Sequence, residues 1–369
     1  MNRRIPFFDY PELFNRHEES LIKVFKDVGR RGAFIMQRDL NEFEENLKEY
    51  TGAKFALGVA NATDGLQLGM MAGGIEEKGE VIISSHTMIA TASAIHFAGG
   101  IPVPVESSED LMIDPLSIEK AINEKTVAIM PTHLNGRTCN MDEINELANK
   151  YSLSIYEDAA QALGSKFKEK FAGTFGIASA ISLYPAKILG TLGDGGAVLT
   201  NDQEVFDKMQ LLRDHGRNPE TGEVVSWGFN SRLDNLHAAF LNFFFKDYEN
   251  VINRRREIAC LYNEALSEVN EIKLPFPPND DDHFDVFQNY EIQAENRNEL
   301  KAYLQNKGIG TLIQWGGSAI HQFKKLKFKV NLPATDKIFS EILMLPLNMF
   351  ISDEDIKFIS NSIKNFYIK

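Results

Sequence analysis

Two stretches of the sequence place a chemically capable side chain beside short apolar runs. Lys187 lies between the runs 181–184 and 197–200, each short enough to be a strand. Between those runs lie glycines that tolerate close backbone approaches which larger residues resist, namely Gly190, Gly193, Gly195 and Gly196. Upstream, a β-prone run that begins at Ser154 ends in the carboxylate Asp158. The sequence therefore predicts Lys187 on a tight loop between two strands and Asp158 at a strand end, where open α/β sheets bind ligands.

A lysine in a glycine-rich turn is by itself usually a solvated surface residue. Together with a carboxylate at a strand end, it matches the two groups that pyridoxal 5′-phosphate (PLP) requires of a protein. The lysine forms a Schiff base with this cofactor, and the aspartate pairs with its pyridinium nitrogen. Asp158 would keep that nitrogen protonated, so that the ring accepts the electrons left when a substrate Cα–H bond breaks. Lys187 would anchor the cofactor and, once displaced, transfer the proton.

Three motifs of the chain resemble those of one known family. They are D-A-A-Q at 158–161, S-L-Y-P-A-K-I-L-G-T-L-G-D-G-G-A-V-L-T-N-D at 182–202 and N-S-R-L-D at 230–234. In this order they resemble the DegT/DnrJ/EryC1/StrS family of PLP-dependent nucleotide-sugar aminotransferases, and the resemblance extends from about residue 39 to the C-terminus. It implies the aspartate aminotransferase fold (fold type I), PLP as the cofactor, and Lys187 and Asp158 as the catalytic pair.

A helix N-terminus is the expected site for the cofactor phosphate. A strand near 55–60 leads into a helix that should open at Thr63 or Asp64, and the first turn of a helix offers free amide hydrogens to an anion. On the residues alone, a helix simply capped by Thr63 or Asp64 is the plainer interpretation. By resemblance, however, Ala62, Thr63 and Asp64 match the phosphate-binding turn of the family. Ser182 matches the family's phosphate-binding hydroxyl.

The resemblance implies three further contacts with the cofactor. Gln161 matches the residue at the 3′-oxygen of the cofactor. Asn230 stands in the G-x-N-x-R segment, whose asparagine reaches the phosphate bound by the other protomer. Met88 stands where the family usually has a stacking aromatic residue, and a thioether can also pack against a ring. The resemblance therefore implies a homodimer with shared active sites.

Four residues are candidates for contact with the substrate: His86, Tyr184, Trp315 and His321. His86 follows a predicted strand, although a lone histidine is more often structural than catalytic. Trp315 and His321 lie in L-I-Q-W-G-G-S-A-I-H-Q-F at 312–323, which departs from the usual H-Y-P-x-P-x-H-x-Q of the family. Asn135 likewise replaces the tyrosine of the family's H-L-Y-G turn.

The composition argues against several classes of protein. The 369 residues carry a formal net charge of −13, whereas nucleic-acid binding needs a basic surface. The hydrophobic fraction of 43% is ordinary for a soluble globular protein. Cys139 and Cys260 show no metal-ligand spacing, so neither a metal site nor a disulfide framework is predicted. Because no apolar stretch has the length of a signal peptide or membrane span, we expect a cytoplasmic protein with no membrane partner.

The remaining pattern predicts the elements that position these residues. Between residues 80 and 130, strand-like and helix-like segments alternate, which indicates a doubly wound, mainly parallel sheet. Asp39 is the predicted N-cap of a helix at 39–50. A long helix expected from about 233 to 269 leads to a smaller part with a strand at 286–293 and helices at 298–307 and from 353. We predict a large PLP-binding α/β domain over 1–250 and a small α+β domain over 251–369.

The favoured hypothesis is an aminotransferase that moves an amino group from an amino acid, L-glutamate, to a keto carbon of a nucleotide-linked deoxysugar. The stretch Y-P-A-K-I-L-G-T-L-G-D-G-G-A resembles the branch acting at C3 of dTDP-linked 3-keto-6-deoxyhexoses, whereas the C4 branch more often shows T-T-G-E-G-G. A PLP-dependent sugar dehydratase is the alternative, but its known branch has a histidine in place of Lys187. A nucleotide-binding oxidoreductase is disfavoured, because G-T-L-G-D-G-G is not G-x-G-x-x-G and leads into a strand.

Overall fold

The computed structural model describes residues 3–278 and 282–368. The helices are, in chain order, α1 (Tyr10–Arg31), α2 (Arg38–Thr51), α3 (Ala62–Ala72), α4 (Ile89–Phe97), α5 (Pro115–Ala121), α6 (Met141–Tyr151), α7 (Gln203–Arg213), α8 (Asn235–Phe245), α9 (Tyr248–Leu266), α10 (Arg297–Asn306), α11 (Pro333–Glu341) and α12 (Asp353–Tyr367). The strands are β1 (Phe55–Val59), β2 (Glu80–Ser84), β3 (Ile101–Val105), β4 (Thr126–Met130), β5 (Ser154–Asp158), β6 (Lys166–Phe167), β7 (Lys170–Phe171), β8 (Ala178–Ser182), β9 (Gly196–Thr200), β10 (Ile272–Lys273), β11 (His283–Phe284), β12 (Tyr290–Ala294) and β13 (Ile342–Leu345).

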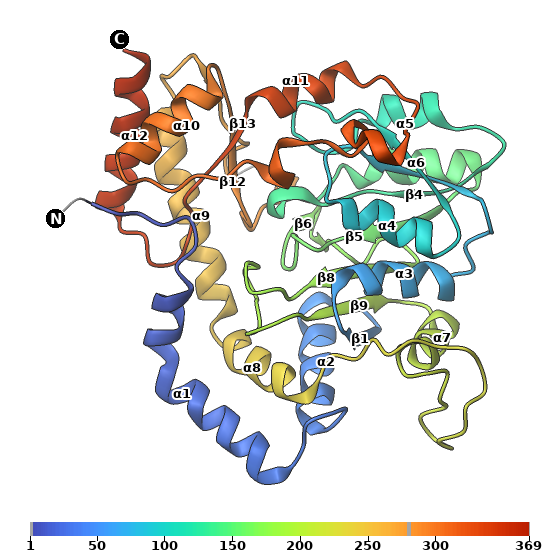
Figure 1. Cartoon of the computed structure of the whole chain (residues 1–369). Helices are drawn as coiled ribbons and strands as arrows, with labels where there is room; N and C mark the ends of the chain where they lie inside the picture. Colours follow the sequence, from blue (N-terminus) through green and yellow to red (C-terminus); the bar gives the residue numbers. More distant parts are fainter. Residues whose placement is uncertain (1–2, 279–281, 369) are drawn as a thin grey trace.

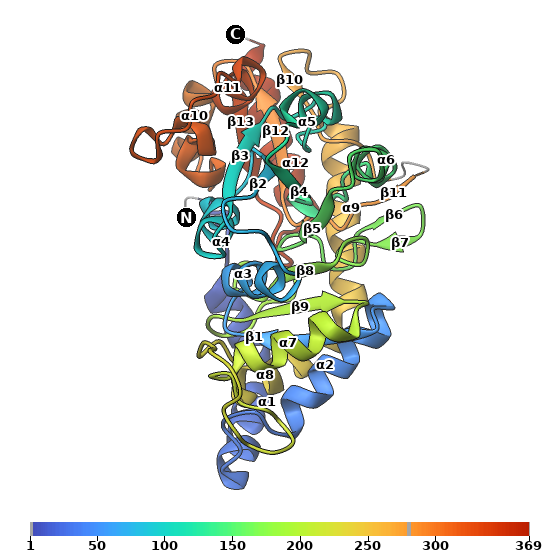
Figure 2. The same ribbon diagram turned by 90° about the vertical axis from the view of Figure 1, so that its right-hand side faces the viewer.

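A seven-stranded sheet forms the centre of the molecule, with the strand order β1-β9-β8-β5-β4-β2-β3 (Figure 1). Neighbouring strands from β8 to β3 run parallel, while β9 is antiparallel to both β1 and β8. Figure 2 shows the strands stacked in this order, from β3 near the top to β1 near the bottom. The predicted mainly parallel α/β sheet is therefore confirmed.

Alternating side chains of the strands bury both faces of this sheet. In β2, Val81 and Ile83 pack with α3 and α4 on one face, whereas Ile82 packs with α5 and α6 on the other. All three residues are fully buried, as expected for a parallel strand covered on both sides. The helices thus hold the sheet rigidly, and its strand ends supply fixed positions for a site.

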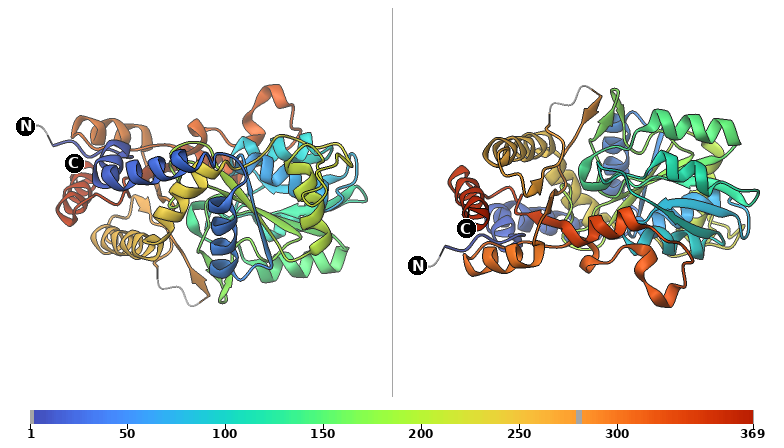
Figure 3. Two further views of the ribbon diagram at one scale, coloured as in Figure 1. Left: turned by 90° about the horizontal axis from the view of Figure 1, so that it is seen from below. Right: turned by 90° about the horizontal axis from the view of Figure 1, so that it is seen from above.

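A second, three-stranded antiparallel sheet, with the order β10-β12-β13, lies beside the long helix α9. Its core joins α9, α10 and α12, and it includes Ile5 from the N-terminal segment. The amide of Ile5 donates to the carbonyl of Gly308 at 2.8 Å. Both termini accordingly lie at this end of the molecule, which the two views in Figure 3 show from below and above.

Several predicted boundaries are wrong. The expected long helix over 233–269 is two helices, α8 and α9, which are separated at Lys246 and Asp247. α8 packs on α1 and α2, whereas α9 packs on α12, so the chain must turn between them. Asp39 does not cap α2, because its carboxylate accepts from Arg31 at 2.9 Å and from Asn235 at 2.7 Å.

The N-terminal helix α1 was not predicted, although Leu21 and Val28 are buried two helical turns apart on it. Within 3–278 and 282–368, no helix combines the length and the apolar character that crossing a membrane requires.

Candidate active site

A pocket of about 490 Å³ opens at the C-terminal ends of the parallel strands β2, β4, β5 and β8. Asp158 is the last residue of β5, and Lys187 follows β8, so the topology brings the two predicted catalytic residues into one cavity. The C-terminal part of the chain closes the opposite wall with Gln288, Asn289, Leu312, Ile313, Gln314, Trp315 and Met344.

A tight turn holds Lys187. Its amide donates to the carbonyl of Tyr184 at 2.8 Å, and a Cβ on Gly190 would lie 2.8 Å from that same oxygen. Glycine is therefore required at position 190 for the turn to close. Burial lowers the pKa of Lys187 from 10.5 to about 8, and the charge of Asp158 partly opposes this shift. An amine with this pKa has a larger neutral fraction near physiological pH than an ordinary lysine has, and the neutral form is the one that attacks a carbonyl group.

Asp158 is buried and fixed by donors on both of its oxygens. Oδ1 accepts the amide of Ala160 at 3.1 Å, and Oδ2 accepts the hydroxyl of Thr91 at 2.7 Å. Each carboxylate oxygen has two lone pairs, so acceptor capacity remains for a ligand. The arrangement presents a fixed carboxylate to the pocket.

The N-terminus of α3 reaches the same pocket through Ala62 and Thr63. The helix begins at Ala62 rather than at the predicted Thr63 or Asp64, because Asn61 is the N-cap and accepts the amide of Asp64 at 2.9 Å. The amides of Ala62 and Thr63 have no acceptor within the helix, which suits them to an anion. Asp64 instead accepts the hydroxyl of Ser231 at 2.7 Å and does not line the pocket.

Gly196 explains how a strand can run past this helix end. A Cβ at position 196 would lie 2.5 Å from the carbonyl carbon of Asn61 and 2.7 Å from the amide nitrogen of Ala62. Only glycine therefore lets β9 begin directly beside the first turn of α3.

Three further predicted cofactor contacts, Ser182, Gln161 and Met88, line the pocket. Ser182 ends β8 on the side of Lys187. Gln161 accepts the amide of Asn135 at 2.8 Å, which fixes the side chain and leaves its NH2 group as a donor for a ligand. Met88 is 49% exposed, at the start of α4.

The structure separates the four substrate candidates. Tyr184 and Trp315 line the pocket, and Trp315 has a φ of 53°, which is unusual for a bulky residue. His86 and His321 do not line it. His86 is fully buried, which lowers its pKa to about 3 and keeps it neutral. His321 contacts Ser85 through Nδ1 at 2.7 Å and Asp336 through Nε2 at 3.0 Å.

Asn230 lies outside the pocket of its own chain. It is exposed and forms an isolated antiparallel bridge with Asp214. The same loop exposes several apolar side chains, and Trp227 is 94% exposed.

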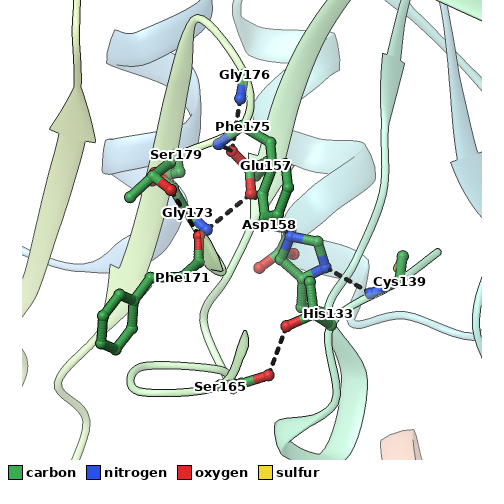
Figure 4. A network of polar contacts seen from close by, with 12 residues as sticks. His133, Cys139, Glu157, Asp158, Ser165, Phe171, Gly173, Phe175, Gly176 and Ser179 are labelled. Atoms are coloured by element: carbon green, nitrogen blue, oxygen red, sulfur yellow. Dashed lines mark hydrogen bonds and ion pairs between the residues drawn. The ribbon is translucent and has the colours of Figure 1, made fainter. Parts of the chain in front are cut away.

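The residue before Asp158 belongs to a separate buried network (Figure 4). Glu157 accepts the amides of Gly173, Phe175 and Gly176, each at 2.7 Å, and contacts Nε2 of His133 at 2.9 Å. Because successive side chains of a strand point to opposite faces, Glu157 ties β5 to the loop 173–176 while Asp158 faces the pocket. This network anchors the strand end that carries Asp158.

A buried polar junction adjoins the pocket at Gln314, which is one of the lining residues. Glu291 on β12 is 2% exposed and accepts from Asn135 at 2.8 Å and from Gln314 at 3.1 Å. Gln314 also donates to Asn135. Burial raises the pKa of Glu291 to about 8, against the lowering effect of these two hydrogen bonds.

Sequence reasoning missed the hydroxyl chain that supports Asp158. Thr132 donates to Thr87 at 3.0 Å, and the Thr87 hydroxyl lies 2.8 Å from that of Thr91. The i, i+4 spacing of Thr87 and Thr91 was the only signal in the sequence, and threonines at such spacing are common. Gln288 and Asn289 were also missed, since only the tertiary fold brings them to Lys187.

The fold and site together define a transferase of the PLP-dependent aminotransferase type. A solved DegT DnrJ EryC1 StrS aminotransferase from Brucella abortus has a TM-score of 0.93 and 33% sequence identity to the chain, covering 99% of it and 100% of that structure. The predicted fold type I is thus confirmed.

The chain belongs to the DegT/DnrJ/EryC1/StrS aminotransferase family, whose sequence model matches residues 15–364. The dTDP-3-amino-3,4,6-trideoxy-alpha-D-glucose transaminase of Streptomyces venezuelae is 37% identical over 85% of this chain and 82% of its own length. A pleiotropic regulatory protein of Geobacillus stearothermophilus is 34% identical, with 98% of each chain covered. The predicted family is therefore confirmed, and this chain is an enzyme of the aminotransferase class.

Proposed function

We propose that the protein is a PLP-dependent aminotransferase that acts on a nucleotide-linked keto-deoxysugar. The observation that carries the proposal is the shared pocket of Lys187 and Asp158, in which one residue is a desolvated amine and the other a fixed carboxylate. A non-enzymatic member of this fold would be expected to lose one of the two.

The residues of the pocket fit the cofactor. Asp158 retains acceptor capacity for a protonated ring nitrogen, and Lys187 is available to hold the cofactor covalently. The first turn of α3 at Ala62 and Thr63, together with Ser182, supplies donors for its phosphate. When bound, PLP supplies the electron sink that allows a substrate Cα–H bond to break.

The residues of the chain account for the proton transfers. Asp158 holds a proton on the ring nitrogen, because a charge-assisted pair is stronger than a neutral hydrogen bond. Nζ of Lys187 would accept the proton from the substrate Cα and deliver it two atoms away, on the far side of the nitrogen that is transferred. Its pKa of about 8 suits an amine that must both accept and donate a proton. In the overall reaction an amino acid, proposed to be L-glutamate, becomes a 2-oxo acid, and the keto sugar becomes an amino sugar.

For the substrate we propose a dTDP-linked 3-keto-6-deoxyhexose aminated at C3. The motif around Lys187 and the name of the Streptomyces venezuelae relative support this choice. Amination at C4 is the alternative. Tyr184 and Trp315 are the proposed sugar-side contacts, since both line the pocket.

We further propose a homodimer in which Asn230 serves the partner's site. The loop that carries Asn230 exposes a cluster of apolar side chains, consisting of Val224, Val225, Trp227 and Phe229. Such a cluster is typical of an interaction surface. Because Asn230 lies outside the pocket of its own chain, the site that it would serve is the one in a second copy of the chain.

The test of the chemistry is spectroscopic and covalent. The purified protein with PLP should absorb in the visible range, and borohydride should abolish that band while fixing the cofactor to Lys187. Asp158→Asn should retain some cofactor but lose more than about tenfold in kcat, which corresponds to about 1.4 kcal/mol in the barrier. A protein that stays colourless with added PLP, or label on another lysine, would rule the proposal out.

A further inference from the structure

The side chain of Gln288 bridges the two residues that flank Lys187. Its Nε2 donates to the carbonyl of Ala186 at 2.9 Å, and its Oε1 accepts the amide of Ile188 at 3.0 Å. Gln288 is only 6% exposed, so both hydrogen bonds are shielded from water. A carboxamide is required for this pair of contacts, because it offers a donor and an acceptor side by side.

The segment that carries Gln288 is itself held firmly. Arg255 on α9 donates through Nε to the carbonyl of Phe287 and through Nη2 to that of Gln288, both at 2.7 Å. On the other side, a Cβ on Gly136 would lie 2.6 Å from the amide nitrogen of Gln288. Phe287 adopts a φ of 52°, a conformation that such a residue keeps only when its surroundings impose it. The two hydrogen bonds from Gln288 to Ala186 and Ile188, here called the clamp, therefore come from a rigid segment.

We propose that Gln288 is a positioning residue for Lys187, fixing the backbone on both sides of the lysine so that its amine stays in the desolvated part of the pocket. The inference rests on the proposed function of Lys187 as the cofactor anchor. Burial is the main cause of the lowered pKa of Lys187. If the clamp is lost, the turn loosens, water reaches the amine, and the pKa rises toward 10.5.

The experiment follows attachment of PLP to the full-length chain from which the cofactor has been dialysed. The rate of attachment is measured by absorbance across a pH series, and borohydride reduction with peptide mapping assigns the label to Lys187. Gln288→Met removes both hydrogen bonds at similar length. It should raise the midpoint of the pH profile by about one unit and slow attachment near neutral pH by about tenfold. Gln288→Glu keeps an acceptor for Ile188 and should fall between wild type and Gln288→Met.

Tyr262→Phe is the matched control, because Tyr262 is fully buried and donates one hydrogen bond, to the carbonyl of Pro346 at 2.9 Å. It should lower thermal stability without moving the pH midpoint.

If Gln288→Met does not fold, Gln288→Glu alone is used for the test. In the folded variant, an unchanged pH midpoint together with an attachment rate within about twofold of wild type would overturn the proposal. So would a change confined to the KM of a substrate. Failure of the wild-type chain to attach PLP at Lys187 would instead refute the proposed function.

Discussion

Thr91 donates its hydroxyl hydrogen to Oδ2 of Asp158 at 2.7 Å, from the first turn of the helix α4. The hydroxyls of Thr132, Thr87 and Thr91 form a continuous chain that ends on this carboxylate. Hydrogen bonds in such a chain polarise one another, which strengthens the last hydrogen bond of the chain. The threonines thus fix the orientation of the Asp158 carboxylate.

Thr91→Val should weaken both the fold and cofactor binding. It leaves a buried carboxylate oxygen without its donor, which costs about 1.5–3 kcal/mol. We expect a loss of that order in the free energy of unfolding, measured in urea, and a PLP dissociation constant raised about tenfold, measured by absorbance titration. Thr91→Ser restores the hydroxyl and should recover most of both. An unchanged PLP affinity in Thr91→Val would show that the hydroxyl chain is not needed.

Lys187→Met should stabilise the cofactor-free protein in a pH-dependent way. The pKa of Lys187 is lowered to about 8 in the folded chain, so below that pH the lysine is protonated in both states and the whole burial penalty is present. As the pH rises toward 10.5 the folded state is already neutral, and the penalty disappears. The gain should be largest below about pH 8, at most about 3 kcal/mol, and should shrink above it. Urea unfolding across this range measures it, and a gain independent of pH would contradict the lowered pKa.

Glu291→Gln should show the opposite pH dependence. The pKa of Glu291 is raised to about 8, so the folded state holds a proton that the unfolded state releases above its ordinary value of 4.5. The substitution should therefore change stability little near pH 4.5 and stabilise by a few kcal/mol above about pH 8. His86, whose Nε2 lies 3.7 Å from Oε2 of Glu291, stays neutral throughout because its pKa is about 3.

The matched control for that substitution is the exposed Glu220→Gln, which should show no such trend. A stability difference in Glu291→Gln that is the same at both ends of the pH range would show that the carboxyl ionises normally.

Mixing two inactive variants should restore activity if the dimer shares its sites. Lys187→Ala lacks the amine, and Asn230→Asp sets a carboxylate against the cofactor phosphate, where like charges repel. A mixed dimer contains one site with both native groups and one with neither, so an equal mixture should regain about a quarter of wild-type activity. Subunit exchange is verified by mass spectrometry. No recovery despite proven exchange would place each complete site within one chain.

Local pattern was sufficient to predict the central sheet and to single out Asp158 and Lys187, which lie in one pocket. The alternation of segments between residues 80 and 130 reflects buried crossovers, and glycines at 190 and 196 mark real close approaches to Tyr184 and Asn61. Asp158 lies at the end of β5 and lines the pocket, as its place at the end of a β-prone run suggested. These features depend on short stretches of chain, which a sequence displays directly.

Features that depend on distant contacts were not predictable. The break between α8 and α9 lies within a continuous helical pattern, and only packing against different partners imposes it. The local sequence predicts Asp39 as an N-cap, but in the fold its carboxylate accepts hydrogen bonds from Arg31 and Asn235. The clamp of Gln288 on the Lys187 turn joins residues about a hundred positions apart, so no local sequence pattern predicts it.

The most direct test of the account is transfer of labelled nitrogen. Wild-type protein is incubated with PLP, 15N-labelled L-glutamate and each of a panel of dTDP- and UDP-linked keto sugars with the keto group at C3 or C4, and the products are analysed by mass spectrometry. We predict that 15N appears in an amino sugar, most rapidly with the dTDP-linked 3-keto-6-deoxyhexose, and that Lys187→Ala abolishes the transfer. Transfer of 15N only to plain 2-oxo acids, with none to any nucleotide sugar, would contradict the account.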